Sequence, residues 1–152
     1  MSASGIHRLQ CRDVEQADVV TAILTSRLAF WLWHVECDGF HVPAWFLAEL
    51  PLLNIRQSTG LDAVARLAAL GQAAWAGVQK DIHCSVNRGR LTFAFRPTAI
   101  GAIRSEIDRT LLDLIGVDPE QAEMLEQFET RVVSIDGSVR RAQQRNHAGD
   151  EE

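Results

Sequence analysis

The chain has 152 residues, of which 47% are hydrophobic and 23% charged; this composition predicts one soluble globular domain and excludes a largely disordered chain. Its formal net charge is -5, which disfavours strong, sequence-independent binding to nucleic acid, although fourteen arginines against one lysine leave room for a local basic patch. Three widely spaced cysteines exclude a disulfide framework and favour a reducing cytoplasm, and no segment is long and apolar enough to predict a membrane span.

The first part of the chain predicts a short strand and a long helix. Residues Ile6 to Cys11 alternate as a strand does. Asp13 is then placed as an N-cap, with Gln16 three residues later in the capping-box position. Apolar residues at helical spacing predict one helix over residues 14–37, which Gly39 is expected to end.

Two further helices follow. Pro43 suits the first turn of a short helix that Pro51 ends. Ser58 or Thr59 can cap a long third helix, whose nearly uncharged interior indicates a central position. Its expected buried stripe includes small residues that permit close helix contact. This stripe comprises Val64, Ala68, Gly71, Trp75, Val78 and Ile82.

The third quarter of the chain predicts a strand and two more helices. A turn at residues 87–90 precedes the clearest strand, Leu91 to Phe95, which we expect to pair with the strand at residues 6–11. Pro97 ends this strand, and Thr98 opens a fourth helix that finishes at Gly116. A fifth helix begins at Asp118, because an N-cap, a proline and a capping-box glutamine follow in order.

These elements predict a mainly α fold of the α+β kind, with about five helices and one small two-stranded β element. We expect a single domain over residues 1–136. Residues 137–152 have no apolar stripe and predict a flexible, charged tail.

Several catalytic motifs are missing from the sequence. The four prolines are never adjacent, so the Asn/Asp-Pro-Pro-aromatic motif of amino-methyltransferases cannot be built. The single lysine, Lys80, does not follow an acidic residue at the PD-(D/E)xK nuclease spacing. The sequence also has no GxxxxGK[ST], GxGxxG or GxSxG motif. We therefore expect no enzyme activity from this chain alone and no cofactor.

A small zinc or acid/base enzyme is a minor alternative. His34 and Cys37 lie three residues apart on a helix, and His41, His83 or Cys84 could complete a zinc site. The competing interpretation is that the cysteines are small buried side chains and the histidines cap or border the core. We favour the second interpretation and expect no metal.

Two clusters favour binding of another molecule. Trp31 and Trp33 point to opposite sides of the predicted first helix, so each either packs in the core or contributes to a surface beside His34. The second cluster is a ridge of arginines around the predicted turn and strand. Either it contacts phosphate, or it is a solvated face with pairs such as Arg104 to Asp108.

Two segments in series resemble a known family. Residues 22–52, "AILTSRLAFWLWHVECDGFHVPAWFLAELPL", and residues 95–128, "FRPTAIGAIRSEIDRTLLDLIGVDPEQAEMLEQF", resemble the C-terminal, target-recognition part of N6-adenine DNA methyltransferases of the type IIG restriction-modification and BREX phage-defence kind. With the helix between them they cover residues 10–132. The chain departs from that family because it lacks the catalytic S-adenosylmethionine site, and its ending "TRVVSI" is less basic.

The resemblance implies a non-catalytic DNA-recognition or accessory subunit that acts with a methyltransferase subunit and contacts double-stranded DNA. The alternative is a protein-interaction module that binds a partner through an apolar helix face, with no nucleic-acid role. Under the first hypothesis two groups of residues form the DNA site. The reading surface comprises Trp33, His34, Asp38, Phe40 and His41, and the phosphate contacts are Arg88, Arg90 and Arg96.

Overall fold

The computed structural model describes residues 8–38, 41–50, 61–87, 89–118 and 120–133. Within these residues the fold is mainly helical with one two-stranded antiparallel sheet, as the sequence predicts. The elements in chain order are α1 (Val14–Thr25), α2 (Arg27–Glu36), α3 (Ala44–Glu49), α4 (Leu61–Asp81), β1 (His83–Asn87), β2 (Arg90–Ala94), the 3-10 helix η2 (Pro97–Ile100), α5 (Gly101–Ile115) and a C-terminal helix over residues 121–133.

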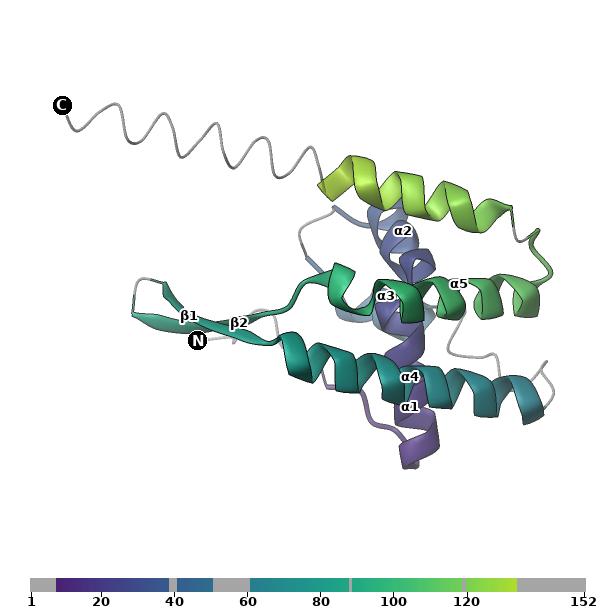
Figure 1. Cartoon of the computed structure of the whole chain (residues 1–152), viewed down its shortest axis with the longest axis horizontal. Coiled ribbons are helices and arrows are strands. Elements are labelled where there is room, and N and C mark those ends of the chain that lie inside the picture. The colour runs from purple at the N-terminus through teal and green to yellow at the C-terminus, as the bar shows by residue number, and fades with distance from the viewer. Residues whose placement is uncertain (1–7, 39–40, 51–60, 88, 119, 134–152) are drawn as a thin grey trace.

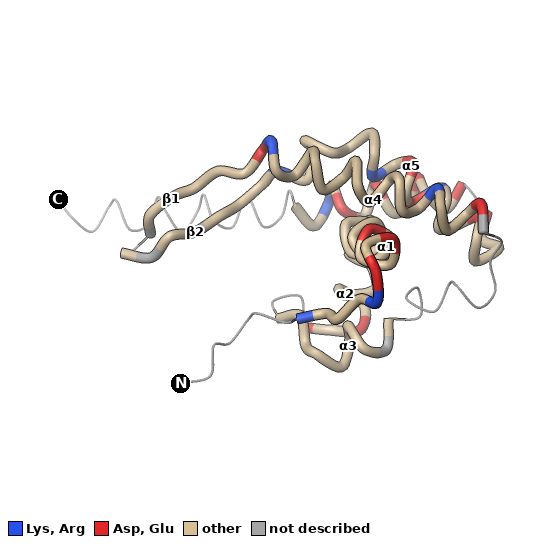
Figure 2. The backbone as a smooth tube through the Cα atoms, turned by 90° about the horizontal axis from the view of Figure 1, so that it is seen from below, with Lys and Arg blue, Asp and Glu red and all other residues tan. Residues whose placement is uncertain are grey.

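The helices form two layers. Figure 1 shows α4, α5 and the C-terminal helix running roughly side by side, with α1 and α2 crossing behind them. The perpendicular view in Figure 2 places α2 and α3 on the far side of α1 from α4 and α5. Side chains from both layers meet in one core, whose largest fully buried apolar side chains are Ile23, Leu50, Leu67, Ile100, Ile107 and Leu111.

The predicted helix over residues 14–37 is wrong as a single helix, because the chain bends at Ser26. Its start is as expected: Asp13 Oδ1 accepts the backbone N–H of Gln16 at 2.7 Å. Ser26 has extended backbone angles, and its hydroxyl accepts the N–H of Ala29 at 3.0 Å, so it caps the new helix α2. The N–H of Arg27 is satisfied at 2.8 Å by the Asp108 carboxylate, which stands on α5.

The central position predicted for α4 is not observed, because its face with Ala65, Ala69, Ala73 and Ala76 is exposed and α5 lies between it and the C-terminal helix (Figure 1). α1 is the helix that packs on α4 most extensively. A Cβ on Gly71 would lie 1.8 Å from the carbonyl oxygen of Asp18, so only glycine permits this helix crossing. The expected stripe is partly wrong, since Trp75 and Ile82 are exposed. The buried face instead comprises Val64, Leu67, Gly71, Ala74 and Val78.

The strand predicted at residues 91–95 is confirmed as β2, but its predicted partner is wrong. β2 pairs with β1 in an antiparallel hairpin, in which Cys84 lies opposite Phe93 and Val86 opposite Leu91. Residues 8–11 have no strand structure, and residues 6–7 lie outside the described part of the chain. A hairpin forms more readily because its two strands adjoin in sequence, and Gly89 has the positive φ of 73° that a tight turn needs.

The last two helices begin and end close to the predicted residues. A 3-10 turn from Pro97 leads into α5, which ends at Gly116 in the left-handed conformation, with φ 70°. Asp118 then accepts the N–H groups of Glu120 and Gln121 through its side chain and backbone carbonyl, respectively. The predicted tail over residues 137–152, together with Gly39, Phe40, Ser58 and Thr59, lies outside the described residues.

Candidate functional site

The turn after α2 brings together three of the residues predicted to read DNA. The indole Nε1 of Trp33 donates to the backbone carbonyl of His41 at 2.7 Å. The two oxygens of Asp38 accept the backbone N–H and the ring Nδ1 of His41, each at 2.8 Å. These bonds fold the chain back against α2 and leave the His41 side chain 84% exposed.

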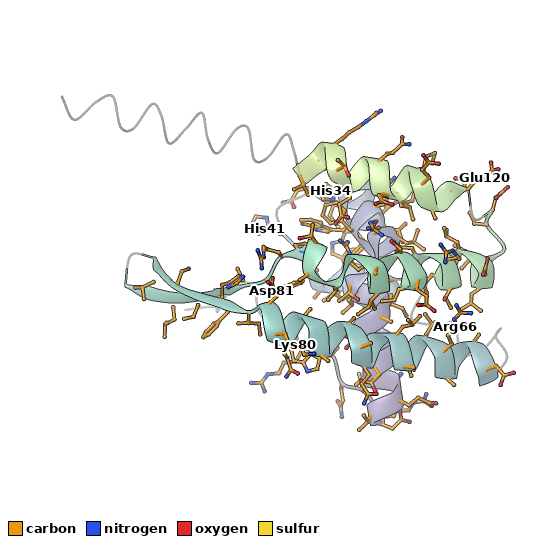
Figure 3. The ribbon with its side chains drawn as sticks, viewed as in Figure 1. His34, His41, Arg66, Lys80, Asp81 and Glu120 are labelled. Carbon is orange, nitrogen blue, oxygen red and sulfur yellow. The ribbon has the colours of Figure 1, made fainter. Side chains whose placement is uncertain are left out.

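His34 lies next to Trp33, with ring centroids 4.6 Å apart, among further aromatic rings. Its ring centroid is 4.2 Å from that of Phe30 and 5.6 Å from that of Phe128 on the C-terminal helix. Its Nδ1 is 3.0 Å from the Phe30 carbonyl oxygen, which can only accept, so Nδ1 carries the hydrogen. Figure 3 shows His34 close to the C-terminal helix, and His41 apart from it. His34 therefore joins α2 to the last helix.

The zinc alternative receives no support from this geometry. Partial burial and the nearby carboxylates of Asp38 and Glu36 raise the pKa of the Cys37 thiol, which disfavours the thiolate that binds a metal. Among the described residues, no three His, Cys, Asp or Glu side chains converge to hold a metal ion.

The structure describes the side chain of only one arginine of the predicted phosphate-binding ridge. Arg88 lies outside the described residues, and only the backbone of Arg90 is described, opposite Asn87. Arg96 is described and belongs to a different cluster at the base of the hairpin. Its Nη2 and Nε donate to Asp81 Oδ1 at 2.5 and 3.1 Å, and its backbone N–H donates to Oδ2 at 2.6 Å.

Asp81 therefore neutralises the charge of Arg96. Hydrogen bonds from the Arg96 side chain and backbone lower the pKa of Asp81 to about 2, and His83 stands 3.4 Å from the same carboxylate. Figure 3 places Asp81 where α4 joins the hairpin. The pair fixes the direction in which the hairpin leaves α4, and it reduces the attraction of Arg96 for a phosphate.

The surface pair predicted between Arg104 and Asp108 is wrong, because both side chains are buried. Arg104 is 5% and Asp108 1% exposed. Arg104 donates to Glu129 Oε1 at 2.5 Å and to the carbonyl of Thr25 at 2.8 Å. Asp108 accepts the Arg27 guanidinium at 3.0 Å, and Arg27 also reaches Glu129 at 3.0 Å.

This four-charge cluster joins α2, α5 and the C-terminal helix. Burial raises the pKa of the Asp108 carboxyl, although Arg27 and Arg104 oppose that rise. Burial also works against the charge on Arg27, but Asp108 and Glu129 outweigh it and raise the pKa of Arg27. Because these groups satisfy one another, the cluster holds the three elements together without leaving a buried charge unpaired.

The surface that sequence reasoning missed is one face of the hairpin. Side chains two apart in a strand share a face, and residues opposite each other across the ladder do too. The ladder places four exposed apolar side chains on one face, Cys84, Val86, Leu91 and Phe93, and the exposed Ile82 and Phe95 continue their alternation one residue outside the strands. Val86 is 71% exposed, and Leu91 and Phe93 are each 67% exposed. We call these six residues the hairpin face.

The hairpin face stands away from the helices. Figures 1 and 2 both show the hairpin projecting beyond the end of α4. The opposite face carries polar side chains, including His83 and Ser85. The period-2 alternation of residues 82, 84 and 86, followed by a turn and by residues 91, 93 and 95, is the sequence signal that could have revealed this face.

An apolar cavity of about 280 Å³ continues the hairpin face at its base. Phe95 belongs to both, and the cavity is also lined by Trp33, Val42, Phe46 and Val133. Trp33 thus has two roles: its indole N–H holds the turn at His41, and its ring borders the cavity. The result is one apolar surface from the hairpin to the space between α2, α3 and the C-terminal helix.

Comparisons with protein-family models, with curated proteins and with solved structures gave no match for this chain. Among the described helices, none combines the length and apolar character needed to cross a membrane.

Proposed function

We propose that this chain is a non-catalytic protein-interaction module that binds a partner protein through the hairpin face. The observation that carries this proposal is the exposure of Val86, Leu91 and Phe93 on a hairpin that projects from the helices. Contiguous exposed apolar surface is typical of protein-protein contacts, since leaving it in water is unfavourable. The docking element differs from the apolar helix face expected from the sequence.

A pair of variants on the hairpin tests this proposal. Phe93→Asp places a charge in the hairpin face, and Ser85→Asp places the same charge on the opposite face of the same hairpin. Tagged wild type and both variants are purified from the native host, and the retained proteins are compared by quantitative mass spectrometry. We expect Phe93→Asp alone to lose a partner held in stoichiometric amount. An untagged copy of the chain, which differs in size from the tagged one on a gel, counts as a retained partner. Identical retention of every partner by all three forms would contradict the proposal.

The second candidate function is that of a DNA-recognition or accessory subunit of an N6-adenine DNA methyltransferase, in the cytoplasm. The observation that favours it is the ordered turn, in which Trp33 and Asp38 hold His41 with its ring exposed. A rigid, exposed polar side chain beside an aromatic one suits contact with base edges. The net charge of -5 and the pairing of Arg96 with Asp81 weigh against a strong phosphate contribution.

A salt titration of binding to duplex DNA tests this second candidate. Phosphate contacts release counterions, so the affinity must fall as salt rises. Replacing both Arg88 and Arg90 with alanine should weaken binding and flatten this dependence, whereas His41→Ala should weaken binding without changing the slope. Absence of duplex binding at low salt, with and without the methyltransferase subunit, would count against a DNA role.

A further inference from the structure

We propose that the partner of the hairpin face is the hairpin face of a second copy of this chain, in a two-fold symmetric dimer. This inference rests on the proposed function, because it names the occupant of the surface that we assign to protein binding. The charges and the cavity favour one of the two possible orientations of the copies.

The hairpin face is self-complementary in shape. Its side chains form two cross-strand rows, Cys84 with Phe93 in the middle and Val86 with Leu91 next to the turn, and Ile82 and Phe95 adjoin them at the base, just outside the paired residues. Each row is apolar, and a sheet face of this kind packs on another sheet face about 10 Å away. A two-fold axis through the middle row makes every contact occur twice, as closed dimers require.

Charge favours the orientation in which the turn of one hairpin lies over the base of the other. Between Lys80 and Arg96 the sequence has four cationic residues and one anionic residue, a net charge of +3. Arg88 and Arg90 at the turn carry +2, whereas Lys80, Asp81 and Arg96 at the base carry a net +1. Turn-over-turn brings the turn arginines of both copies together, whereas turn-over-base brings them toward Asp81 at the base of the other copy and so reduces the repulsion between the two copies.

The same orientation adds contact area at each end. The six side chains expose on the order of 500 Å² of apolar surface per chain, so stacking two faces removes about 1,000 Å² from water, near the lower limit for a specific interface. With the turn over the base, Val86 and Leu91 also approach Phe95 and the cavity that it borders. We therefore expect a reversible dimer with a dissociation constant of roughly micromolar size rather than an obligate one.

Sedimentation velocity of the full chain measures the monomer–dimer equilibrium. Protein concentrations from about 1 to 500 μM cover the range in which a micromolar dissociation constant changes the dimer fraction. Wild type and Ser85→Asp should pass from monomer to dimer as concentration rises, while Phe93→Asp should remain monomeric throughout. Phe93 is 67% exposed, so its replacement should leave the fold intact, and thermal unfolding followed by circular dichroism checks this point. Wild type that stays monomeric, or a dimer that Phe93→Asp does not weaken, would overturn the inference.

Thiol cross-linking gives a second, geometric readout. The axis through the middle row sets Cys84 of one copy across from Cys84 of the other, with the backbones about 10 Å apart and the two sulfurs closer than that, so a bismaleimide with a short spacer should join them. The covalent dimer should disappear in Cys84→Ser and persist in Cys11→Ser. A product that does not depend on Cys84 would contradict this orientation.

The outcomes also separate this inference from the proposed function. If wild type is monomeric and Phe93→Asp fails to retain a host protein that wild type retains, the hairpin face binds a different protein. Self-association is then wrong, and the proposed function stands. If neither self-association nor any host partner depends on Phe93, both fail.

Discussion

Asp108 on α5 holds the first residue of α2 at two points. Its Oδ1 accepts the backbone N–H of Arg27 at 2.8 Å, and its Oδ2 accepts the guanidinium Nη1 at 3.0 Å. One carboxylate therefore satisfies a helix N-terminal N–H and neutralises the side chain of the same residue. Because Asp108 is 1% exposed, neither contact can be replaced by water without opening the core.

Asp108→Ala should lower the free energy of unfolding by about 3 kcal/mol, since it leaves the buried backbone N–H of Arg27 without its acceptor and removes one of the two carboxylates, Asp108 and Glu129, that lie 3.0 Å from the guanidinium. The matched control is Glu106→Ala on the same helix, which removes the exposed pair with Arg66 at 3.1 Å. Exposed pairs contribute about 0.2–1 kcal/mol. Urea unfolding measures both, and equal losses in the two variants would mean that the buried cluster has no special role.

The contact between Asp81 and Arg96 predicts a dependence of stability on pH. The pKa of Asp81 is lowered to about 2 in the folded chain, below its ordinary value of 3.8. The contribution of this carboxylate is therefore complete above about pH 4 and is lost as pH falls through about 2. Wild type should lose more stability than Asp81→Asn between these pH values, as unfolding followed by circular dichroism at each pH will measure. A parallel loss in both proteins would contradict the assignment.

Gly71 sets the distance between α1 and α4. Gly71→Ala should destabilise the chain by about 2 kcal/mol or more, because its Cβ would overlap the carbonyl of Asp18 and the two backbones would have to separate. Gly101→Ala is the control: it has helical backbone angles and no atom within 4 Å of the added Cβ. That substitution should be neutral or stabilising by about 0.4–1 kcal/mol. Thermal unfolding of the two variants compares them directly.

Ser26 ends α1 and begins α2. Ser26→Ala removes the acceptor for the Ala29 N–H and the donor to the Ile23 carbonyl, so we expect a loss of about 1–2 kcal/mol in unfolding free energy. Thr130→Ala removes an exposed hydroxyl that donates only along its own helix, to Glu126, and should change stability by less than about 0.5 kcal/mol. If the two losses were similar, the bend at Ser26 would not depend on this cap.

The candidate site was partly predictable. The turn residues Trp33, Asp38 and His41 adjoin in sequence, and the structure brings them together through bonds that span at most eight residues. The hairpin face was predictable in principle from its alternation, but expecting β2 to pair with residues 6–11 hid it. A strand that pairs with a distant segment can face a core, whereas the hairpin observed projects from the helices and has one apolar face exposed.

The sequence alone determined those features that depend on near neighbours. The caps at Asp13 and Gly116, the strand β2 and the mainly helical class all follow from residues within a turn or two of one another. The bend between α1 and α2 needs both levels, because the cap at Ser26 is local but Asp108 satisfies the N–H of Arg27 from 81 residues away. Tertiary structure alone decided that Arg104 is buried, since a charge enters a core only where distant partners such as Glu129 meet it.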